Sequence, residues 1–204
     1  DNITRLIAGL YKQIGKDLEE IIIVDDDSPD GTWKIVKSLS KTKNKVRLIR
    51  RINKRGLPSA ISTGIKNSKG NIVAWLDCDF SHPLDMIKKM AKYIPEYDII
   101  CASRYVKGGH DKRNLPRVLI SRVLNIFGDI ILNIGVKDLT SGFYAVKRDV
   151  FRNIELKQDG YAEYCIRFVF DATRNGCKIK EVPYTFIDRE KGSSKSYKNI
   201  ANFI

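Results

Sequence analysis

A repeated alternation of short apolar runs with amphipathic stretches limits the fold of this chain more than any other feature. Four runs rich in Ile, Val and Leu predict strands, at residues 20–26, 46–50, 71–77 and 98–104. Helical patterns separate them, around residues 32–41, 57–67 and 83–93. Because the apolar runs are continuous rather than alternating, both faces of each strand should be covered. The sequence therefore predicts an α/β fold with a mainly parallel sheet and helices on both faces.

The rest of the chain extends this fold with a less regular pattern. It predicts an amphipathic helix over residues 118–136, a helix near residues 161–175 and a final strand over residues 177–187. No repeat or low-complexity linker divides the sequence, so we expect one domain over residues 1–204. Because residues 1–15 already form a helical pattern, we also expect the domain to be truncated before Asp1, where a first strand is missing. Truncation after Ile204 is a second expectation.

The stretch over residues 118–136 is the best candidate for a membrane segment. Arg122, Asn125 and Asp129 interrupt it, so it contains no run of 18 charge-free apolar residues and is not expected to span a bilayer. We expect its apolar stripe to pack on the protein's own core. The alternative is that the stripe lies in a membrane interface.

Charge and cysteine content narrow the choice of partner. The chain carries 37 basic and 24 acidic residues, a formal net charge of +13. This surplus favours an anionic partner, which can be nucleic acid, an anionic membrane or a phosphorylated substrate, although a lysine-rich solvated surface is also common. The four cysteines are widely spread and lack metal-ligand spacing, so we expect neither zinc nor disulfides.

Two of the predicted strands end in clusters of aspartate. Asp25 and Asp26 follow "IIIV", and Asp77 and Asp79 follow "IVAWL". In open parallel sheets ligands bind outside the carboxyl ends of the strands, so these carboxylates should converge on one crevice. Like charges this close need a cation or hydrogen-bond donors, and oxygen ligands suit Mg²⁺ or Mn²⁺. Since Mg²⁺ usually completes its shell with phosphate and water, the pattern favours a diphosphate-bearing substrate.

Other motifs with known chemistry do not fit the sequence. The run from Asp26 resembles the start of an EF-hand loop, but Pro29 and Lys37 stand at its fourth and twelfth positions, which excludes a calcium loop. The P-loop, dinucleotide-binding, serine-hydrolase and zinc-protease motifs are absent. His82 allows two interpretations, either a ligand or base, or a hydrogen-bonding residue before the helix that follows Pro83.

Seven sequence blocks occur in order along nearly the whole chain. They are "VDDDSPDGT" (24–32), "RGLPSAISTGI" (55–65), "LDCDFSHP" (76–83), "SRYVKGG" (103–109), "LPRVLISRVLN" (115–125), "DLTSGFYAVKR" (138–148) and "VPYTFIDREKGSSK" (182–195). On these blocks the chain resembles glycosyltransferase family 2 and, within it, the dolichyl-phosphate (polyprenyl-phosphate) mannosyltransferases. The resemblance implies the nucleotide-sugar-binding α/β fold called GT-A.

The resemblance also implies roles for individual residues. Asp77 and Asp79 form a D-x-D motif that holds Mg²⁺ or Mn²⁺ against the donor diphosphate, and Ser141 and Gly142 line the sugar and acceptor. The implied donor and cofactor site comprises Val24, Asp26, Asp77, Cys78, Asp79, Ser81 and Arg104. The implied catalytic residues are mostly basic side chains that surround the donor and acceptor phosphates. They are Asp79, Arg104, Arg117, Arg189 and Lys195.

The implied reaction is an inverting transfer of mannose from GDP-mannose to dolichyl or polyprenyl phosphate at the cytoplasmic face of a membrane. A lipid phosphate is already largely dianionic near neutral pH, its second pKa being about 6, so it needs no general base. One alternative is transfer from a UDP-sugar to the same acceptor class. Another is a non-catalytic basic module that binds RNA or an anionic membrane. RNA binding would require aromatic and basic residues on an exposed sheet face, which buried strands do not offer, so we expect an anionic membrane as partner and no nucleic acid.

Overall fold

The structure is a computed structural model that describes residues 2–156 and 163–188. Its α-helices are α1 (Asn2–Ile14), α2 (Thr32–Thr42), α3 (Leu57–Asn67), α4 (Asp85–Ala91), α5 (Leu115–Leu132) and α6 (Glu163–Arg174). Two 3₁₀ turns are η1 (Gly15–Asp17) and η2 (Arg148–Arg152). The strands are β1 (Ile21–Asp25), β2 (Val46–Arg50), β3 (Ile72–Trp75), β4 (Ile99–Ser103), β5 (His110–Asp111), β6 (Tyr144–Lys147), β7 (Ile179–Pro183) and β8 (Thr185–Phe186).

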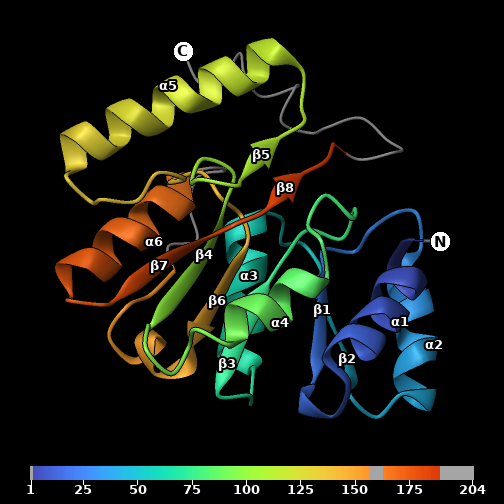
Figure 1. Cartoon of the computed structure of the whole chain (residues 1–204). Coiled ribbons are helices and arrows are strands. Elements are labelled where there is room, and N and C mark those ends of the chain that lie inside the picture. The colour runs from blue at the N-terminus through green and yellow to red at the C-terminus, as the bar shows by residue number, and fades with distance from the viewer. Residues whose placement is uncertain (1, 157–162, 189–204) are drawn as a thin grey trace.

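The described strands form three groups (Figure 1). Strands β1 and β2 pair in parallel, and a four-stranded sheet has the order β3-β6-β4-β7. In that sheet β4 and β7 are parallel, whereas β6 runs antiparallel to both of its neighbours. A short parallel pair, β5 and β8, lies below α5. Within the described ranges no ladder joins β1 to β3, and a strand upstream of Asp1 stays a prediction.

Strand β4 shows how both faces of the larger sheet are covered. All five of its residues are buried. Ile99 and Cys101 pack in one cluster with residues of α3 and α6, whereas Ile100 and Ala102 pack in another with Met86 and Met90 of α4. Because successive side chains of a strand point to opposite faces, these two clusters are the two sides of a helix–sheet–helix sandwich. The predicted α/β fold with helices on both faces of the sheet is confirmed.

The second core lies under α1 and α2, which lie together on one side of the β1–β2 pair (Figure 1). Ile3, Leu6, Ile7 and Leu10 recur at helical spacing on α1 and are all buried. They pack with Ile21 and Ile23 of β1 and with Val36 of α2. This packing fixes the end of β1, where the first aspartate cluster begins.

The predicted helices and strands match the structure in the N-terminal half of the chain, and the predicted strands differ from it in the C-terminal half. All four predicted strands before Tyr105 are present, each within two residues of its expected ends. Strand β6 was not predicted, because only four residues of a longer motif form it. The single final strand expected over residues 177–187 is two strands, β7 and β8.

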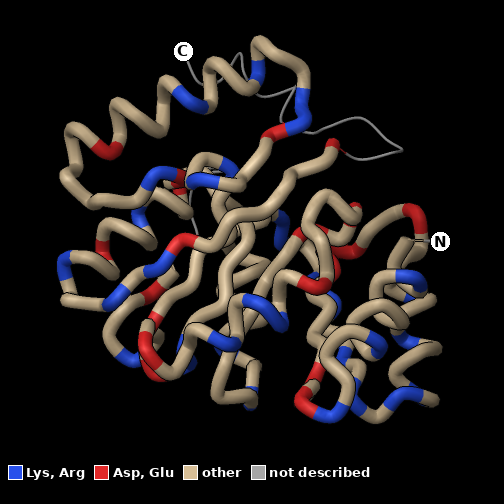
Figure 2. Tube along the Cα trace, in the orientation of Figure 1, with Lys and Arg blue, Asp and Glu red and all other residues tan. Residues whose placement is uncertain are grey.

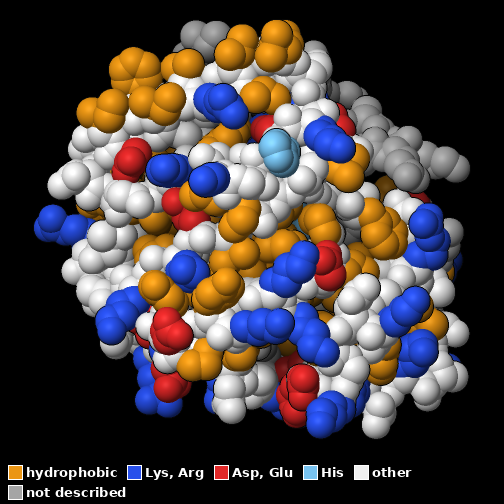
Figure 3. Space-filling view, in the orientation of Figure 1, with side chains coloured by type: hydrophobic (Ala, Val, Ile, Leu, Met, Phe, Trp, Pro, Cys, Tyr) orange, Lys and Arg blue, Asp and Glu red, His pale blue; other side chains and the backbone are white. Residues whose placement is uncertain are grey.

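Helix α5 contradicts the expected packing of its apolar stripe. Its only buried residue is Asn125, and large apolar side chains along it are exposed. Figure 3 shows them as an orange band over α5 at the top of the molecule. The expectation that this stripe packs on the protein's own core is therefore wrong. Among the residues described, no helix combines the length and apolar character needed to cross a membrane.

Candidate active site

Acidic residues gather at the carboxyl end of β1 (Figure 2). Asp25 is buried, and its Oδ1 accepts a hydrogen bond from the backbone N–H of Ser28 at 2.8 Å. Asp30 Oδ1 accepts the N–H of Thr32, the first residue of α2, at 2.9 Å. These two contacts shape the turn that carries the chain from β1 into α2 and fix the Asp25 carboxylate at the rim of the sheet.

Asp26 is held by a basic partner that directly follows β2. Arg51 donates from Nε to Asp26 Oδ1 at 2.6 Å, and the N–H of Gly56 donates to Oδ2 at 3.0 Å. Arg51 is only 7% exposed, and it also donates to the Ser59 hydroxyl at 2.9 Å. The negative charge of Asp26 is thus compensated inside the protein. The sequence analysis missed Arg51. Its signal is the pair Arg50-Arg51 at the end of an apolar run, because the neighbouring parallel strand ends in aspartates that such arginines can pair with.

The second cluster follows β3 and is shaped by two hydrogen-bonding side chains. Asp79 Oδ1 accepts hydrogen bonds from the Ser81 N–H at 3.0 Å and the Ser81 hydroxyl at 2.6 Å. The N–H of Asp77 donates to Nδ1 of His82 at 3.0 Å. Ser81 and His82 are each 2% exposed. The two buried side chains therefore set the backbone and carboxylate orientation of the D-x-D loop.

The loop after β3 lies beside β1. Leu76 and Phe80, which flank the D-x-D motif, pack against the hydrophobic core that includes Ile21 and Ile23 of β1. Between the two acids of the motif, Cys78 reaches the surface, but surrounding protein atoms desolvate its thiol and, with nearby negative charges, raise its pKa to about 11. This packing places the D-x-D motif beside β1, the strand that ends at Asp25.

His82 is a neutral residue inside an aromatic cluster. Its ring stacks on Phe143 with centroids 4.8 Å apart, and Tyr184 and Phe186 contact it edge-on at 5.9 Å. Burial lowers its pKa to about 4, so Nδ1 is an acceptor for the Asp77 N–H at neutral pH. The hydrogen-bonding interpretation of His82 is confirmed, and this geometry does not favour a base.

Arg104 is engaged with a buried carboxylate. Its Nε donates to Asp138 Oδ2 at 2.9 Å and its Nη2 to Oδ1 at 2.6 Å, and the side chain is 5% exposed. Burial lowers the pKa of Arg104, but the hydrogen bonds to Asp138 and the negative charge of Asp138 raise the pKa of Arg104 overall. Asp111 lies 3.7 Å away. This arrangement favours a structural role over the predicted contact with phosphate, because two carboxylates already compensate the charge. The sequence did not indicate the pair, since its members are 34 residues apart.

The remaining predicted residues lie in different places. Arg117, on the first turn of α5, donates to Asp188 Oδ2 at 3.2 Å, so it lies next to the end of the described chain. Arg189 and Lys195 lie outside the described residues. Val24 is half-buried in β1 and packs near Gly64 of α3. The Ser141 hydroxyl donates to the carbonyl of Ala102 at 2.6 Å, and a Cβ on Gly142 would meet the ring of His82 at 3.9 Å.

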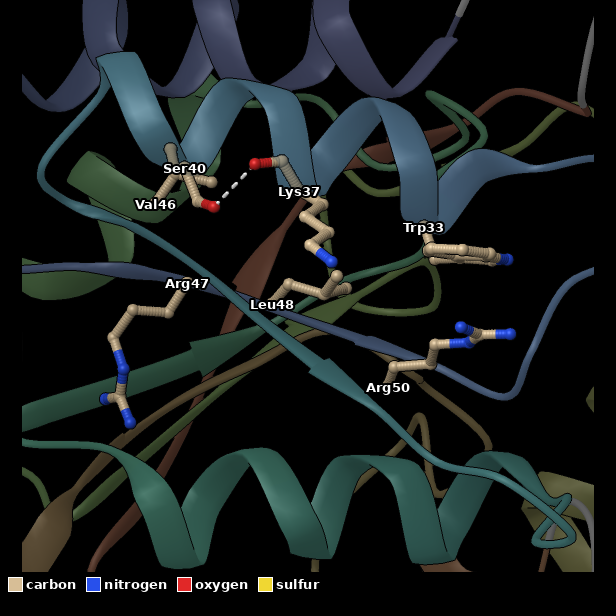
Figure 4. Close-up of a pocket in the computed structure, with 7 residues that line it drawn as sticks. All are labelled: Trp33, Lys37, Ser40, Val46, Arg47, Leu48 and Arg50. Atoms are coloured by element: carbon tan, nitrogen blue, oxygen red, sulfur yellow. Dashed lines mark hydrogen bonds between the residues drawn. The ribbon is translucent and has the colours of Figure 1, made fainter.

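A hollow of about 490 Å³ lies elsewhere, between α2 and β2 (Figure 4). Arg50 and Trp33 stack at one end with the guanidinium 3.6 Å from the ring centroid. Its lining contains no carboxylate, so it is distinct from the acidic rim. Across residues 2–156 and 163–188, no three His, Cys, Asp or Glu side chains are grouped as a metal site.

Comparisons with known proteins agree with the fold. The family model for glycosyl transferase family 2 matches residues 1–155. A dolichol-phosphate mannosyltransferase from Pyrococcus furiosus is 39% identical over 183 residues, which cover 86% of this chain and 50% of that protein. A polyprenol monophosphomannose synthase from Mycolicibacterium smegmatis is 33% identical over 184 residues, 86% of this chain and 69% of that protein. The chain thus spans half the length of the first relative.

Solved structures with low sequence identity share the architecture. A Pyrobaculum calidifontis mannosyltransferase in complex with GDP-Man and Mn²⁺ has a TM-score of 0.65 at 19% identity, covering 98% of this chain and 56% of that one. A Mycobacterium tuberculosis glucosyl-3-phosphoglycerate synthase with Mn²⁺ and UDP has a TM-score of 0.72 at 15% identity, covering 98% and 71%. These likenesses concern the GT-A fold. On the family match and the two sequence relatives, the chain belongs to glycosyl transferase family 2.

Proposed function

We propose that residues 1–204 form one catalytic domain that transfers mannose from GDP-mannose to a dolichyl or polyprenyl phosphate with inversion. The observation that carries the proposal is the position of the D-x-D motif, which follows β3 and is flanked by Leu76 and Phe80 packed against the core of β1, the strand that ends at Asp25. The two named sequence relatives support mannose as the sugar and a polyprenol phosphate as the acceptor. UDP-sugars are a weaker alternative, because the neighbour with UDP shares only 15% identity with this chain.

We propose that Asp77 and Asp79 hold a divalent cation, Mg²⁺ or Mn²⁺. Carboxylate oxygens are the donors that these hard cations prefer, and Mg²⁺ commonly binds through one or two protein carboxylates plus substrate phosphates. The residues present fit this requirement, since Asp77 and Asp79 supply two carboxylates and the Ser81 hydroxyl holds one oxygen of Asp79. When bound, the cation would neutralise charge on the departing nucleoside diphosphate. Ser81 orients the carboxylate of Asp79 through its hydroxyl. Cys78, between the two acids, stays a proposed residue of the donor site.

The donor nucleoside would lie beside β1. Val24 and Asp26 are the residues proposed to contact it. Because Arg51 and Gly56 already hold both carboxylate oxygens of Asp26, this acid is pre-positioned by its partners. A base or ribose that approaches Asp26 would meet a carboxylate whose orientation does not change on binding.

The basic residues divide into two groups by their surroundings. Arg117, with Arg189 and Lys195, is proposed to seat the acceptor phosphate, since a planar guanidinium grips phosphate in two places. Contacts of this electrostatic type are typically worth about 3–4 kcal/mol in the transition state. Arg104 is assigned instead to positioning, because its ion pair with Asp138 ties the segment after β4 to the segment before β6.

No general base is required for this reaction, and His82 supports that assignment. A lipid phosphate is largely dianionic near neutral pH and can attack the anomeric carbon directly, because its second pKa is about 6. His82 is buried and its Nδ1 is used by the Asp77 N–H. Its part in the reaction is therefore to hold the D-x-D loop. We place the domain at the cytoplasmic face of an anionic membrane, where such a lipid acceptor resides, and assign it no nucleic acid.

The test is a transfer assay with GDP-mannose, UDP-glucose and UDP-GlcNAc in parallel, each with Mg²⁺, Mn²⁺ or chelator and a polyprenyl phosphate acceptor. We expect transfer from GDP-mannose that chelator abolishes. Asp77→Asn should reduce it by at least about 100-fold, as loss of a transition-state contact does. Asp27→Asn is the matched control, since Asp27 pairs with Arg50 at the same rim. Undiminished transfer in chelator would overturn the metal role, and transfer from a UDP-sugar alone would overturn the donor.

A further inference from the structure

The positive charge of this chain is concentrated in one segment. Residues 31–76, which contain α2, β2, α3 and β3, include 12 Lys and Arg and no Asp or Glu. Because the net charge of the whole chain is +13, the rest of the chain is close to neutral. Figure 2 shows Lys and Arg along α2 and no acidic residue on it. This distribution makes the surface of α2 and β2 attractive to an anionic partner.

Strand β2 is the outer member of the β1–β2 pair and has an open edge (Figure 1). The Ile21 N–H donates to the Lys45 carbonyl at 2.7 Å, and the Arg51 N–H donates to the Asp25 carbonyl at 2.8 Å. Since successive residues of a strand direct their backbone groups to opposite edges, the odd-numbered residues of β2 face β1. The backbone groups of the even-numbered residues, such as Leu48, point outward. Among the residues that the structure describes, no strand pairs with this outer edge.

The hollow of about 490 Å³ lies beside β2, on the side of α2 (Figure 4). Trp33 and Lys37 line it from α2, and Leu48 and Arg50 line it from β2. Arg47 points to the other face of the strand, where it donates to a backbone carbonyl at the end of α3 at 3.0 Å. A segment added to the edge of β2 would therefore meet basic side chains on both of its faces, and the Trp33 ring would be available to an apolar side chain.

The basic residues at this edge have capacity for further carboxylates. Arg47 pairs with Glu20 and Arg50 pairs with Asp27, and the two arginine side chains remain 36% and 34% exposed. A guanidinium has five N–H donors, so one carboxylate partner leaves donors for a second. Lys37 is exposed on α2, a helix with three lysines and no acidic residue. An acidic ligand could therefore bind here without breaking the existing ion pairs.

An extended acidic peptide fits this edge better than other occupants do. Phosphate groups accept hydrogen bonds but have no donor for the outward carbonyls of β2, whereas a peptide backbone offers both donors and acceptors. A second copy of β2 would bring Arg47 and Arg50 against their own counterparts, and charged edge strands discourage such self-pairing. The chain's own residues 189–204 contain four basic residues and one acid, so their charge does not match the surface.

We propose that an extended acidic segment of a partner protein adds to the outer edge of β2 as a further strand, with its carboxylates against Lys37, Arg47 and Arg50. Main-chain hydrogen bonds to the edge supply the affinity, and basic residues on both faces select acidic sequences. The lining of the hollow contains no residue of the D-x-D motif. The inference therefore does not rest on the proposed sugar transfer.

The first experiment measures by calorimetry the binding of the 204-residue chain to a capped acidic peptide. The peptide is about six residues long, the usual length of a strand, and combines valine with glutamates on both faces. A second peptide has the same sequence with every backbone amide methylated, so it keeps each charge but cannot donate main-chain hydrogen bonds. We expect the first peptide to bind and the methylated peptide to bind at least about tenfold more weakly, because several hydrogen bonds are lost.

Variants of the protein locate the binding surface. Lys37→Glu should weaken binding of the unmethylated peptide by about fivefold or more, because repulsion replaces attraction. Lys92→Glu is the matched control, since it makes the same charge change at an exposed lysine after α4, and it should leave the affinity unchanged. Amide hydrogen exchange should slow at Leu48 and Arg50 when the peptide binds, because their N–H groups point outward from β2.

Several results would overturn the inference. Absence of binding by the acidic peptide would do so, as would equal binding of the methylated and unmethylated peptides. Equal peptide affinity of the wild type and Lys37→Glu, with both folded by circular dichroism, would place the peptide elsewhere. Binding of single-stranded DNA in preference to the acidic peptide would identify a general polyanion surface and contradict a docking site for a strand.

Discussion

Helices α5 and α6 have amphipathic sequences but face the protein in opposite ways. α6 buries Tyr164, Cys165, Phe168, Val169 and Ala172 against the sheet. α5 buries Asn125 alone and turns its apolar residues outward. Amphipathicity therefore establishes that a helix has two faces, but the available polar partners decide which face meets the protein. In α5 these partners are the hydroxyls and backbone groups near Thr140.

The largest expected contrast comes from truncating one phenylalanine in each helix. Phe168→Ala should lower the free energy of unfolding by about 3–5 kcal/mol, because it opens a cavity among Trp75, Tyr144 and Phe151. Phe127→Ala should change it by less than about 0.5 kcal/mol, because the ring is 60% exposed. Chemical denaturation of both variants measures the difference. Equal losses would contradict the outward orientation of α5.

The buried ion pair of Arg104 with Asp138, in the polar layer beneath α5, should stabilise the fold strongly. Asp138→Ala leaves the Arg104 guanidinium buried without its main partner, and breaking a buried ion pair in this way typically costs about 3–5 kcal/mol. Denaturation of the variant measures the loss. Double substitution with Arg104→Met should recover part of it, because the uncompensated charge is then removed. No recovery in the double variant would contradict a structural ion pair.

His82 is a polar side chain buried among aromatic rings, and the pH dependence of protein stability tests its burial. Its pKa is lowered from 6.5 to about 4 by burial, so the unfolded chain takes up this proton before the folded protein does. The contribution of His82 to the free energy of unfolding is therefore complete above about pH 6.5. It falls by roughly 3 kcal/mol in total as the pH drops toward 4. The unfolding free energy measured across this range should lose that slope in His82→Gln. An unchanged slope in the variant would assign the effect to other groups.

A smaller effect is expected at Asn125, the one buried residue of α5. Asn125→Ala removes partners from the backbone and hydroxyl of Thr140 and should cost about 1–3 kcal/mol. Ser40→Ala, at an exposed contact within α2, is the matched control and should have little effect. If Asn125→Ala were as mild as its control, the polar attachment of α5 would be wrong.

The sequence was most informative where local pattern and topology act together. Continuous apolar runs located β1 to β4. The rule that ligands bind beyond parallel strand ends predicts that Asp25, Asp26, Asp77 and Asp79 share one crevice, and this stays a prediction. Contacts between distant segments could not be predicted this way. The ion pair of Arg104 with Asp138 forms because the segment that follows β4 meets the segment that precedes β6, and these strands are antiparallel neighbours.

Helix orientation was the other limit of the sequence. The stripe of α5 was correctly recognised as apolar. Its direction depends on the hydrogen bond that Ser121 accepts from Tyr105 and on the one that Asn125 donates to Thr140. The ion pair of Asp26 with Arg51 was missed for a different reason. Residues just beyond two paired parallel strands lie side by side, so the register of β1 with β2 would have revealed it.

Binding of Mn²⁺ in the presence of GDP tests the acidic rim most directly. Electron paramagnetic resonance of free Mn²⁺ measures the affinity without any sugar transfer. The account predicts Mn²⁺ binding by the wild type and by Asp27→Asn, and at least about tenfold weaker binding by Asp77→Asn and Asp79→Asn, since each loses a carboxylate ligand. Unchanged Mn²⁺ affinity in both of the latter variants would contradict it.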